Sequence, residues 1–372
     1  MSEEKDWYLV NHPEEIDSPA LLIYSERVKR NIEMAKQMVG EVSRLRPHVK
    51  THKNSEVTKL QLEAGITKFK CATIAEAEML AICKAPDVLL AYQPSGPKLD
   101  RFIALILKYP DTKFSCIVDN EATAHVISVE VQSHQLQINV YIDLNVGMNR
   151  TGIKPGTKAQ ELYLACNLMP GIKPIGLHAY DGHIHDSDLQ ERTTKSNKLY
   201  ESVKQLQQDI VKQGITEPVI IAGGSPTFPF YAEKKDVECS PGTFIYWDAG
   251  YLEAFQEQKF LPAAVLLSRI ISLPTETRIC LDLGHKSVGA ENALNKRVRF
   301  LNADGLVPVS QSEEHLIVEA PQYHGYKPGD VFYLLPFHVC PTVALYERVA
   351  IIVNGDFAGE WINTARDRKI TM

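Results

Sequence analysis

The chain has 372 residues, of which 44% are hydrophobic and 23% charged, and its formal net charge is −6 at pH 7. This length exceeds one typical domain, so we expect one large domain and a smaller one. No block of Lys and Arg stands out along the sequence, which argues against a nucleic-acid surface because binding phosphates requires clustered positive charge.

The polar first six residues do not resemble a secretory signal, and no apolar run approaches the ~20 residues that span a bilayer. The seven cysteines are scattered and include no Cys-x-x-Cys pair. We therefore expect a cytoplasmic protein with reduced thiols, without a disulfide framework and without a membrane segment.

Helix-like and strand-like stretches alternate from about residue 20. The first is a helix expected over residues 25–39, where apolar residues recur at helical spacing behind a serine cap. Short apolar runs bounded by turn signals then predict strands at 42–50, 68–73, 87–92, 114–119, 138–143, 172–179, 218–223 and 237–246. Helical patterns lie between them at 74–85, 97–107, 121–132, 156–168 and 189–213.

Most of these runs are more apolar than alternating, as expected for parallel strands covered on both faces. A doubly wound sheet gives the same alternation, so the count of eight favours a (β/α)8 barrel. After about residue 255 strands dominate, at 263–273, 277–283, 316–319, 331–335 and 349–353. We therefore expect an α/β barrel domain over residues 1–255 and a small antiparallel β-domain over 256–372.

The densest cluster of ionisable residues is Arg-Pro-His-Val-Lys-Thr-His-Lys at 46–53, at the end of the first expected strand. Barrel active sites are built at the carboxyl ends of the strands. A lysine partly desolvated among other cations can have its pKa lowered and become a nucleophile for an aldehyde. The alternative is a solvated basic turn.

Polar loops follow the fifth and sixth expected strands. Arg150 lies in a glycine-containing loop, where its fork of donors could hydrogen-bond an anionic oxygen. In the stretch 180–186, Tyr180 could stack on a cofactor ring, and His183 could bind metal or move protons. An ordinary polar loop is the alternative for both.

Glycine-containing turns follow the seventh expected strand and accompany the eighth. Glycines let backbone N–H groups approach a phosphate closely, and barrel phosphate sites are characteristically built from these two loops. Most glycine pairs are plain turns, so the position in the barrel is what supports this hypothesis. The candidates are Gly223, Gly224, Ser225, Ser240, Gly242 and Thr243.

His338 and Cys340 stand two residues apart in the tail. On a strand they would face the same side, and both side chains suit zinc. A two-residue match is usually coincidence, although two protein ligands would leave room for substrate and water, as a catalytic metal site needs.

Together these stretches resemble the fold-type III pyridoxal-phosphate enzymes, of which alanine racemase is the familiar member. The closer resemblance is to the D-threonine aldolase and D-serine dehydratase branch. The likeness covers nearly the whole chain and includes residues 17–22, 46–53, 71–78, 87–92, 312–315, 336–343 and 361–366.

This resemblance implies a pyridoxal 5′-phosphate cofactor bound by Lys50 rather than Lys53, with Arg150 at its phenolic oxygen and Tyr180 against its ring. It implies that His338 and Cys340 are metal ligands next to the cofactor. The residues implied to hold the phosphate are Gly223, Gly224, Ser225, Gly242 and Thr243.

Two departures from alanine racemases bear on the reaction. Ser240 stands where those enzymes place an arginine, so the pyridine nitrogen would meet only a neutral hydroxyl. The stretch 283–286 also lacks the tyrosine that supplies their second catalytic base. Racemisation is therefore disfavoured.

Within the branch, aldolases pair the histidine with an aspartate, whereas dehydratases resemble this chain in using cysteine. Because a thiolate prefers zinc to harder ions such as manganese, we expect zinc, with manganese as the alternative. The expected reaction is the D-serine dehydratase type, which converts a small β-hydroxy D-amino acid to a keto acid and ammonia. In it the freed Lys50 amine removes the α-proton.

In the D-threonine aldolase alternative, the metal and a base, for which His183 is the candidate, deprotonate the β-hydroxyl so that the Cα–Cβ bond breaks. A non-catalytic pyridoxal-phosphate-binding protein and a barrel without cofactor are alternatives from other classes. The likeness also implies a homodimer.

Overall fold

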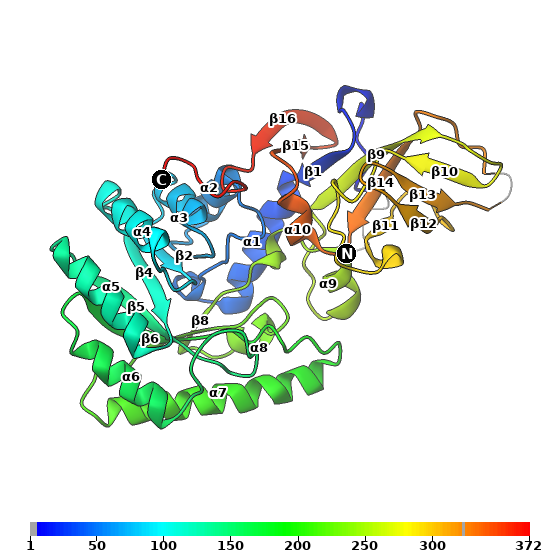
Figure 1. Cartoon of the computed structure of the whole chain (residues 1–372). Coiled ribbons are helices and arrows are strands. Elements are labelled where there is room, and N and C mark those ends of the chain that lie inside the picture. The colour runs from blue at the N-terminus through cyan, green and yellow to red at the C-terminus, as the bar shows by residue number, and fades with distance from the viewer. Residues whose placement is uncertain (1–5, 322–323) are drawn as a thin grey trace. The chain divides into compact units, whose positions relative to one another are not determined.

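The computed structural model describes residues 6–321 and 324–372 and divides the chain into two compact units (Figure 1). Unit 1 comprises Met1–Glu33, Thr51–Val57 and Thr243–Arg366. Unit 2 comprises Met34–Lys50, Thr58–Gly242 and Asp367–Met372. The spatial units thus do not follow a single boundary at residue 255, because the chain passes between them several times.

Unit 2 is built on seven parallel strands in the order β2-β3-β4-β5-β6-β7-β8, so that each strand pairs with the next one along the chain. The strands are β2 (Lys68–Cys71), β3 (Asp87–Leu90), β4 (Lys113–Val118), β5 (Ile138–Asp143), β6 (Ile172–Ala179), β7 (Val219–Ala222) and β8 (Val237–Cys239). This confirms the α/β fold with a parallel barrel sheet. The last strand is shorter than expected because Pro241, which has no N–H, and Gly242 follow it closely.

An extended segment at residues 45–49 links the two edges of this sheet. Leu45 forms a parallel bridge with Cys239 of β8, and His48 forms one with Lys70 of β2. The strand expected at 42–50 is therefore only partly right: it begins as a 3-10 turn, Val42–Arg44, and continues as this irregular segment. Pro47 explains the irregularity, since it cannot donate to a ladder, although its carbonyl accepts from the N–H of Lys70.

A buried ion cluster lies inside unit 2. The side chain of Arg46 is 1% exposed, and its guanidinium pairs with Asp87 at 2.6 Å and Glu238 at 2.8 Å. Lys68 also binds Glu238. Burying an arginine costs several kcal/mol unless it is paired, so the two carboxylates are what allow Arg46 to lie here.

The expected helices correspond to α1 and α3–α7, with ends shifted by three residues or fewer. α4 shows why such a pattern predicts well, since its apolar positions, including Leu99, Phe102 and Ile103, are buried. The helices are α1 (Ser25–Val39), α2 (Ser55–Glu63), α3 (Ile74–Ile82), α4 (Pro97–Lys108), α5 (Glu121–Ser133), α6 (Thr157–Asn167), α7 (Leu189–Val211), α8 (Phe228–Ala232), α9 (Ala249–Ala254) and α10 (Val339–Val343).

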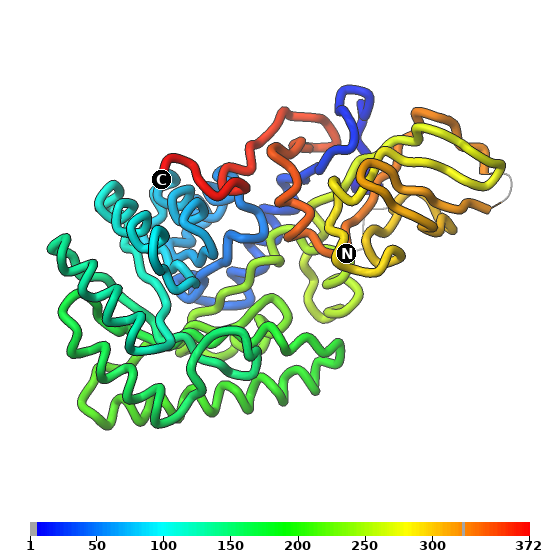
Figure 2. The backbone as a smooth tube through the Cα atoms, in the orientation of Figure 1, coloured from blue at the N-terminus to red at the C-terminus, as the bar shows by residue number. Residues whose placement is uncertain are grey.

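Unit 1 contains the β-rich part of the chain, which the tube in Figure 2 follows from β9 onward. Its strands run in the order β12-β13-β10-β9-β1-β15-β16, and β14 pairs with both β9 and β11. The sheet is mixed, because β1 lies antiparallel to β9 but parallel to β15. The strands are β1 (Ala20–Tyr24), β9 (Ala264–Ser272), β10 (Arg278–Leu281), β11 (Val298–Phe300), β12 (Val307–Gln311), β13 (Leu316–Glu319), β14 (Val331–Pro336), β15 (Arg348–Val353) and β16 (Asp356–Ile362).

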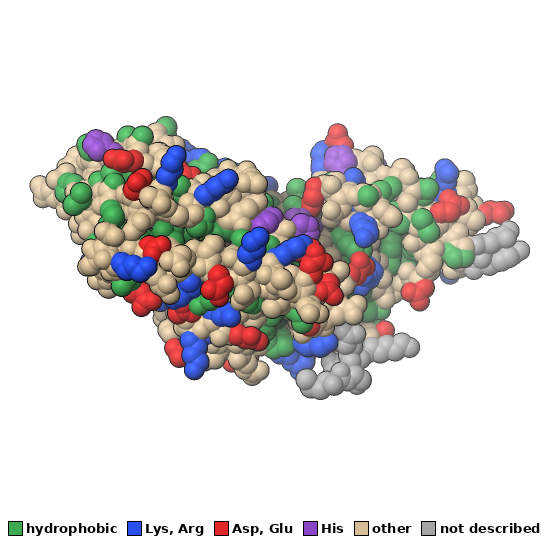
Figure 3. All heavy atoms as spheres, turned by 90° about the horizontal axis from the view of Figure 1, so that it is seen from below, with side chains coloured by type: hydrophobic (Ala, Val, Ile, Leu, Met, Phe, Trp, Pro, Cys, Tyr) green, Lys and Arg blue, Asp and Glu red, His purple; other side chains and the backbone are tan. Residues whose placement is uncertain are grey.

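No helix within residues 6–321 and 324–372 is both long and apolar enough to cross a membrane. Acidic and basic side chains are interspersed over the face of the molecule seen in Figure 3.

Candidate active site

Three cations of unit 2 approach the ring of Tyr180, which directly follows β6. The Nζ atoms of Lys50 and Lys70 each lie 5.5 Å from the ring centroid, and the guanidinium carbon of Arg150 lies 5.2 Å from it. Each of these residues lies at or just beyond the carboxyl end of a barrel strand or of the 45–49 segment. Several positive charges around an aromatic ring suit a planar, anionic ligand.

The loop that contains Arg150 is ordered by its own side chains. The Oδ1 atom of Asn145 accepts hydrogen bonds from the N–H groups of Gly147 and Asn149, each at 3.1 Å. Gly152 donates its N–H to Asp119 at 2.9 Å. These contacts fix the backbone on both sides of Arg150, so its guanidinium is held from an anchored loop.

His183 packs against the same loop. A Cβ atom added at Gly147, whose φ is +125°, would lie 2.6 Å from Nε2 of His183, so this close approach requires glycine. Within the described residues, the Nδ1 atom of His183 is buried without a hydrogen-bond partner. The structure thus places His183 beside the Arg150 loop, and its proposed role as a base stays a prediction.

Lys70 is a site residue that the sequence analysis missed. It is fully buried, and its Nζ lies 2.5 Å from Oγ of Ser240 and 3.5 Å from Nε2 of His178. His178 in turn contacts Asp143 through Nδ1 at 2.7 Å. Burial first, and then the charge of Lys50, lower the pKa of Lys70 to about 7. The signal in the sequence was a lysine at every second position of an apolar strand, Lys68 and Lys70.

The two glycine-containing loops after β7 and β8 meet in unit 2. The hydroxyl of Ser225 accepts a hydrogen bond from the N–H of Gly242 at 3.3 Å. Gly224 donates its N–H to Asp181 at 3.2 Å, and a Cβ on Gly224 would lie 3.4 Å from the Tyr180 ring. A phosphate that uses these N–H groups would replace two internal hydrogen bonds.

Gly223 adopts φ +81°, a conformation that favours glycine. The structure therefore brings Gly223, Gly224, Ser225 and Gly242 together beside Tyr180. With the surrounding cations, this arrangement fits pyridoxal phosphate, whose ring and phosphate need an aromatic neighbour, positive charge and close backbone approach.

The candidate metal ligands lie in unit 1, and the expectation that they share a strand is wrong. β14 ends at Pro336, and His338 is instead the N-cap of the short helix α10. The chain turns here because the N–H of Val339 donates to the buried carboxylate of Asp248 at 3.0 Å.

The side chains of His338 and Cys340 nevertheless lie together. Burial lowers the pKa of His338, but its hydrogen bond to Cys340, the charges of Cys340 and Asp248 and its hydrogen bond to Glu291 outweigh this and raise the pKa to about 9. The thiol of Cys340 lies 3.2 Å from the hydroxyl of Thr51, the residue after Lys50 in the sequence.

The phosphate candidate Thr243 belongs to unit 1, and its hydroxyl lies 3.7 Å from the same Cys340 thiol. Glu291, a second residue missed by the sequence analysis, lies 2.5 Å from Nδ1 of His338. A carboxylate on one ring nitrogen orients a histidine so that the other nitrogen can bind metal.

The donor set therefore fits a soft divalent ion, with His338 and Cys340 as ligands and Glu291 as the orienting carboxylate. In the described parts of the chain, no group of three or more His, Cys, Asp or Glu side chains is arranged to hold a metal. His338 and Cys340 thus offer two donors, which leaves other positions around an ion to substrate or water.

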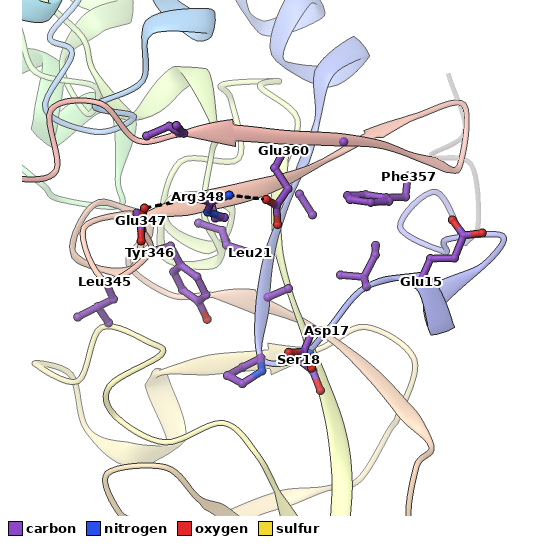
Figure 4. A pocket seen from close by; sticks show the side chains of 16 residues that line it. Glu15, Asp17, Ser18, Leu21, Leu345, Tyr346, Glu347, Arg348, Phe357 and Glu360 are labelled. Atoms are coloured by element: carbon purple, nitrogen blue, oxygen red, sulfur yellow. Dashed lines mark hydrogen bonds and ion pairs between the residues drawn. The ribbon is translucent and has the colours of Figure 1, made fainter.

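A separate surface pocket of about 910 Å³ lies in unit 1, lined by residues around β1, β15 and β16. Figure 4 shows Arg348 at its wall between Glu347 and Glu360, with ion pairs of 3.3 and 3.0 Å. None of the site residues expected from the sequence lines this pocket.

Comparison with known proteins identifies the family. The profile of "Alanine racemase, N-terminal domain" matches residues 23–249, and that of "Putative serine dehydratase domain" matches residues 263–352.

Curated relatives match along most of the chain. A D-threonine aldolase from Arthrobacter sp is 25% identical and covers 94% of this chain and 93% of its own. A 3-hydroxy-D-aspartate aldolase from Paracoccus denitrificans (strain Pd 1222) is 24% identical, with 95% and 93% covered. A D-threo-3-hydroxyaspartate dehydratase from Delftia sp. (strain HT23) is 27% identical, with 63% and 62% covered.

Solved structures share the fold. D-threonine aldolase from Filomicrobium marinum has a TM-score of 0.87 at 24% identity, covering 95% of this chain and 96% of its own. Two structures of D-threo-3-hydroxyaspartate dehydratase are mutants, one with a histidine replaced by alanine and one, metal-free, with a cysteine two positions later replaced. Their TM-scores are 0.82 and 0.81 at 21% and 22% identity, covering 94% of this chain and 95% and 97% of theirs. The chain thus belongs to the alanine racemase N-terminal domain family, within the fold-type III pyridoxal-phosphate proteins, and its second part matches the serine dehydratase domain.

Proposed function

We propose that this protein is a pyridoxal-phosphate- and metal-dependent lyase acting on small β-hydroxy D-amino acids. Within this class we propose elimination of the D-serine dehydratase type, which yields a keto acid and ammonia. The more general proposal, a pyridoxal-phosphate-dependent lyase of D-amino acids, is supported by the family and by relatives named as aldolases and dehydratases.

Lys50 is proposed as the residue that holds the cofactor and then acts as the base. When bound, pyridoxal phosphate supplies an electron sink for negative charge at the substrate Cα. Lys50 extends to the Tyr180 ring, and its amine, once released by the substrate amine, would take the α-proton. Arg150, on its anchored loop, would orient the cofactor by binding an anionic oxygen.

The observation that carries the choice of elimination is the Cys340 thiol beside the His338 imidazole. These two side chains would hold a divalent metal, and a metal held there would supply Lewis-acid stabilisation of a departing β-oxygen. A thiolate ligand favours zinc over harder ions. The dehydratase mutants give support, since a histidine and a cysteine at the same two-residue spacing were replaced there and the cysteine mutant is metal-free.

Aldol cleavage of the D-threonine aldolase type is the second candidate. It is favoured by the near full-length similarity to two aldolases and by the TM-score of 0.87. His183, half-buried against the Arg150 loop, would serve as the base that deprotonates the β-hydroxyl.

Product analysis tests the proposal. The purified protein is loaded with pyridoxal phosphate and zinc and incubated with D-serine, D-threonine and 3-hydroxy-D-aspartate. A keto acid and ammonia in equal amounts support elimination, and glycine with an aldehyde supports cleavage. A visibly loaded protein that turns over none of the three would leave the non-catalytic cofactor-binding alternative.

A further inference from the structure

Lys70 and its neighbours form a polar layer inside unit 2, between the Arg46 ion cluster and the cations around Tyr180. Lys68 and Lys70 stand two residues apart on β2, and Glu238 on β8 stands two residues before Ser240, which directly follows that strand. Accordingly Lys68 binds Glu238 and Lys70 binds Ser240. The pair of Lys68 with Glu238 is an ion pair, whereas the pair of Lys70 with Ser240 joins a cation to a neutral hydroxyl.

The hydrogen atoms of this layer can be assigned from its contacts. The Ser240 hydroxyl donates to the carbonyl of Gly223 at 3.2 Å, so towards Lys70 it accepts. The Nδ1–H of His178 donates to Asp143 at 2.7 Å, because a carboxylate can only accept. Nε2 of His178 is then an acceptor that faces Lys70.

Lys70 therefore directs its hydrogens at two neutral acceptors. Among the described residues, no carboxylate lies within ion-pair distance of its amine. The charged groups that face it from farther away are Lys50 and Arg46, which disfavour its charge, and Asp181 and Asp143, which favour it. A fully buried ammonium without a direct counter-ion can lose its charge near neutral pH.

We propose that Lys70 is a second functional lysine of the cofactor site, a positioning residue that acts through Ser240 and sets the protonation state of the cofactor held by Lys50. This inference rests on the proposed cofactor site and deepens it. The family resemblance implies that the ring nitrogen of the cofactor faces the Ser240 hydroxyl. The surroundings of that nitrogen would then include the positive charge of Lys70 as well as the neutral hydroxyl. The Ser240 hydrogen is committed to Gly223, and a cation stands directly behind the hydroxyl.

The consequence is a coupling between Lys70 and the cofactor. While Lys70 is protonated, its positive charge disfavours protonation of the ring nitrogen of the cofactor. When Lys70 loses its proton, that repulsion disappears. Since the pKa of Lys70 is lowered to about 7, the coupling falls in a pH range that spectroscopy can cover.

The test is a pH titration of the visible absorbance of the holoenzyme, from pH 6 to 9, without substrate. Wild type should show a transition near neutral pH. Lys70→Met, of similar length but uncharged, should lose it, and Lys70→Arg should hold the low-pH spectrum throughout. The matched control is Lys68→Met, on the same face of the same strand, which should retain the wild-type transition because Lys68 serves Glu238.

A wild type without a transition, or a Lys70→Met spectrum that titrates like wild type, would overturn the inference. If Lys70→Met does not fold, the same titration is measured on Lys70→Arg and Ser240→Ala. A titration like that of wild type in both variants would also contradict the proposal. A purely structural Lys70 would change melting temperature but not the titration. Failure of the proposed cofactor site would look different, because wild type would then show no visible band after loading.

Discussion

The Nζ atom of Lys50 lies 5.5 Å from the centre of the Tyr180 ring, in the part of unit 2 where Lys70 and Arg150 also converge. Lys53 lies three residues later but belongs to unit 1. It adopts φ +51°, and its carbonyl accepts a hydrogen bond from the N–H of Ala365. The two lysines of the basic stretch therefore belong to different units, and Lys50 is in the same unit as the Tyr180 ring.

Lys50→Ala should abolish the visible absorbance of the loaded protein, because no amine would remain in place to bond the cofactor's aldehyde. Lys53→Ala is the matched control and should keep the band at wild-type intensity. Absorbance spectra after loading and desalting measure both. A band that survives in Lys50→Ala would mean that Lys70 or Lys53 binds the cofactor instead.

Arg150→Ala should weaken cofactor binding by about tenfold, the lower end for a hydrogen bond to a charged group. It should also shift the visible spectrum, since a cation beside a phenolic oxygen favours its anionic form. Equilibrium dialysis and absorbance are the measurements. Lys154→Ala, an exposed cation just beyond the same loop, should change neither. Unchanged affinity and spectrum in Arg150→Ala would place this residue outside the site.

Glu291→Gln should lower the affinity for zinc by roughly 10- to 100-fold, because the carboxylate that orients the His338 ring is lost. Metal content after titration with a chelator measures the effect. Glu313→Gln, which alters an exposed ion pair with Lys286, is the control. In wild type, complete removal of metal should abolish lyase activity and leave the cofactor bound. Full activity of the metal-free protein would contradict the metal site.

Glu238→Gln should destabilise the protein by about 3 kcal/mol, the range for breaking a buried ion pair, since Arg46 would keep only Asp87 as a charged partner. Glu360→Gln removes an exposed partner of Arg348 and should cost less than about 1 kcal/mol. Chemical denaturation gives both free energies of unfolding. Equal losses of unfolding free energy in the two variants would mean that the buried ion pairs of Arg46 stabilise the protein no more than an exposed ion pair does.

The sequence predicted the parallel strands well because each is a short apolar run bounded by turn residues, and β5 and β6 match residue for residue. It failed where a tertiary contact decides the backbone. His338 and Cys340 read as strand positions, but the Asp248 carboxylate caps Val339 and turns the chain into α10. For β8, which Pro241 and Gly242 follow closely, the sequence predicted too long a strand.

The sequence singles out the candidate site residues where the motif is local, and it misses the contacts that are built across strands. Arg150, Tyr180 and the glycine loops stand out as sequence stretches, and the structure brings them together. Lys70 contacts Ser240 and His178 only through the barrel, because the partners are separated by 170 and 108 positions in the sequence. Glu291 meets His338 across 47 residues in a segment without any recognisable pattern.

The most direct test of the account is the fate of the Cα–Cβ bond in D-threonine. The loaded protein is incubated with D-threonine, and 2-oxobutyrate, ammonia, glycine and acetaldehyde are measured in the same reaction. A thiolate-bound zinc that assists departure of the β-oxygen predicts 2-oxobutyrate and ammonia in equal amounts, with little glycine. Glycine and acetaldehyde as the main products would contradict elimination and establish the aldolase reaction instead.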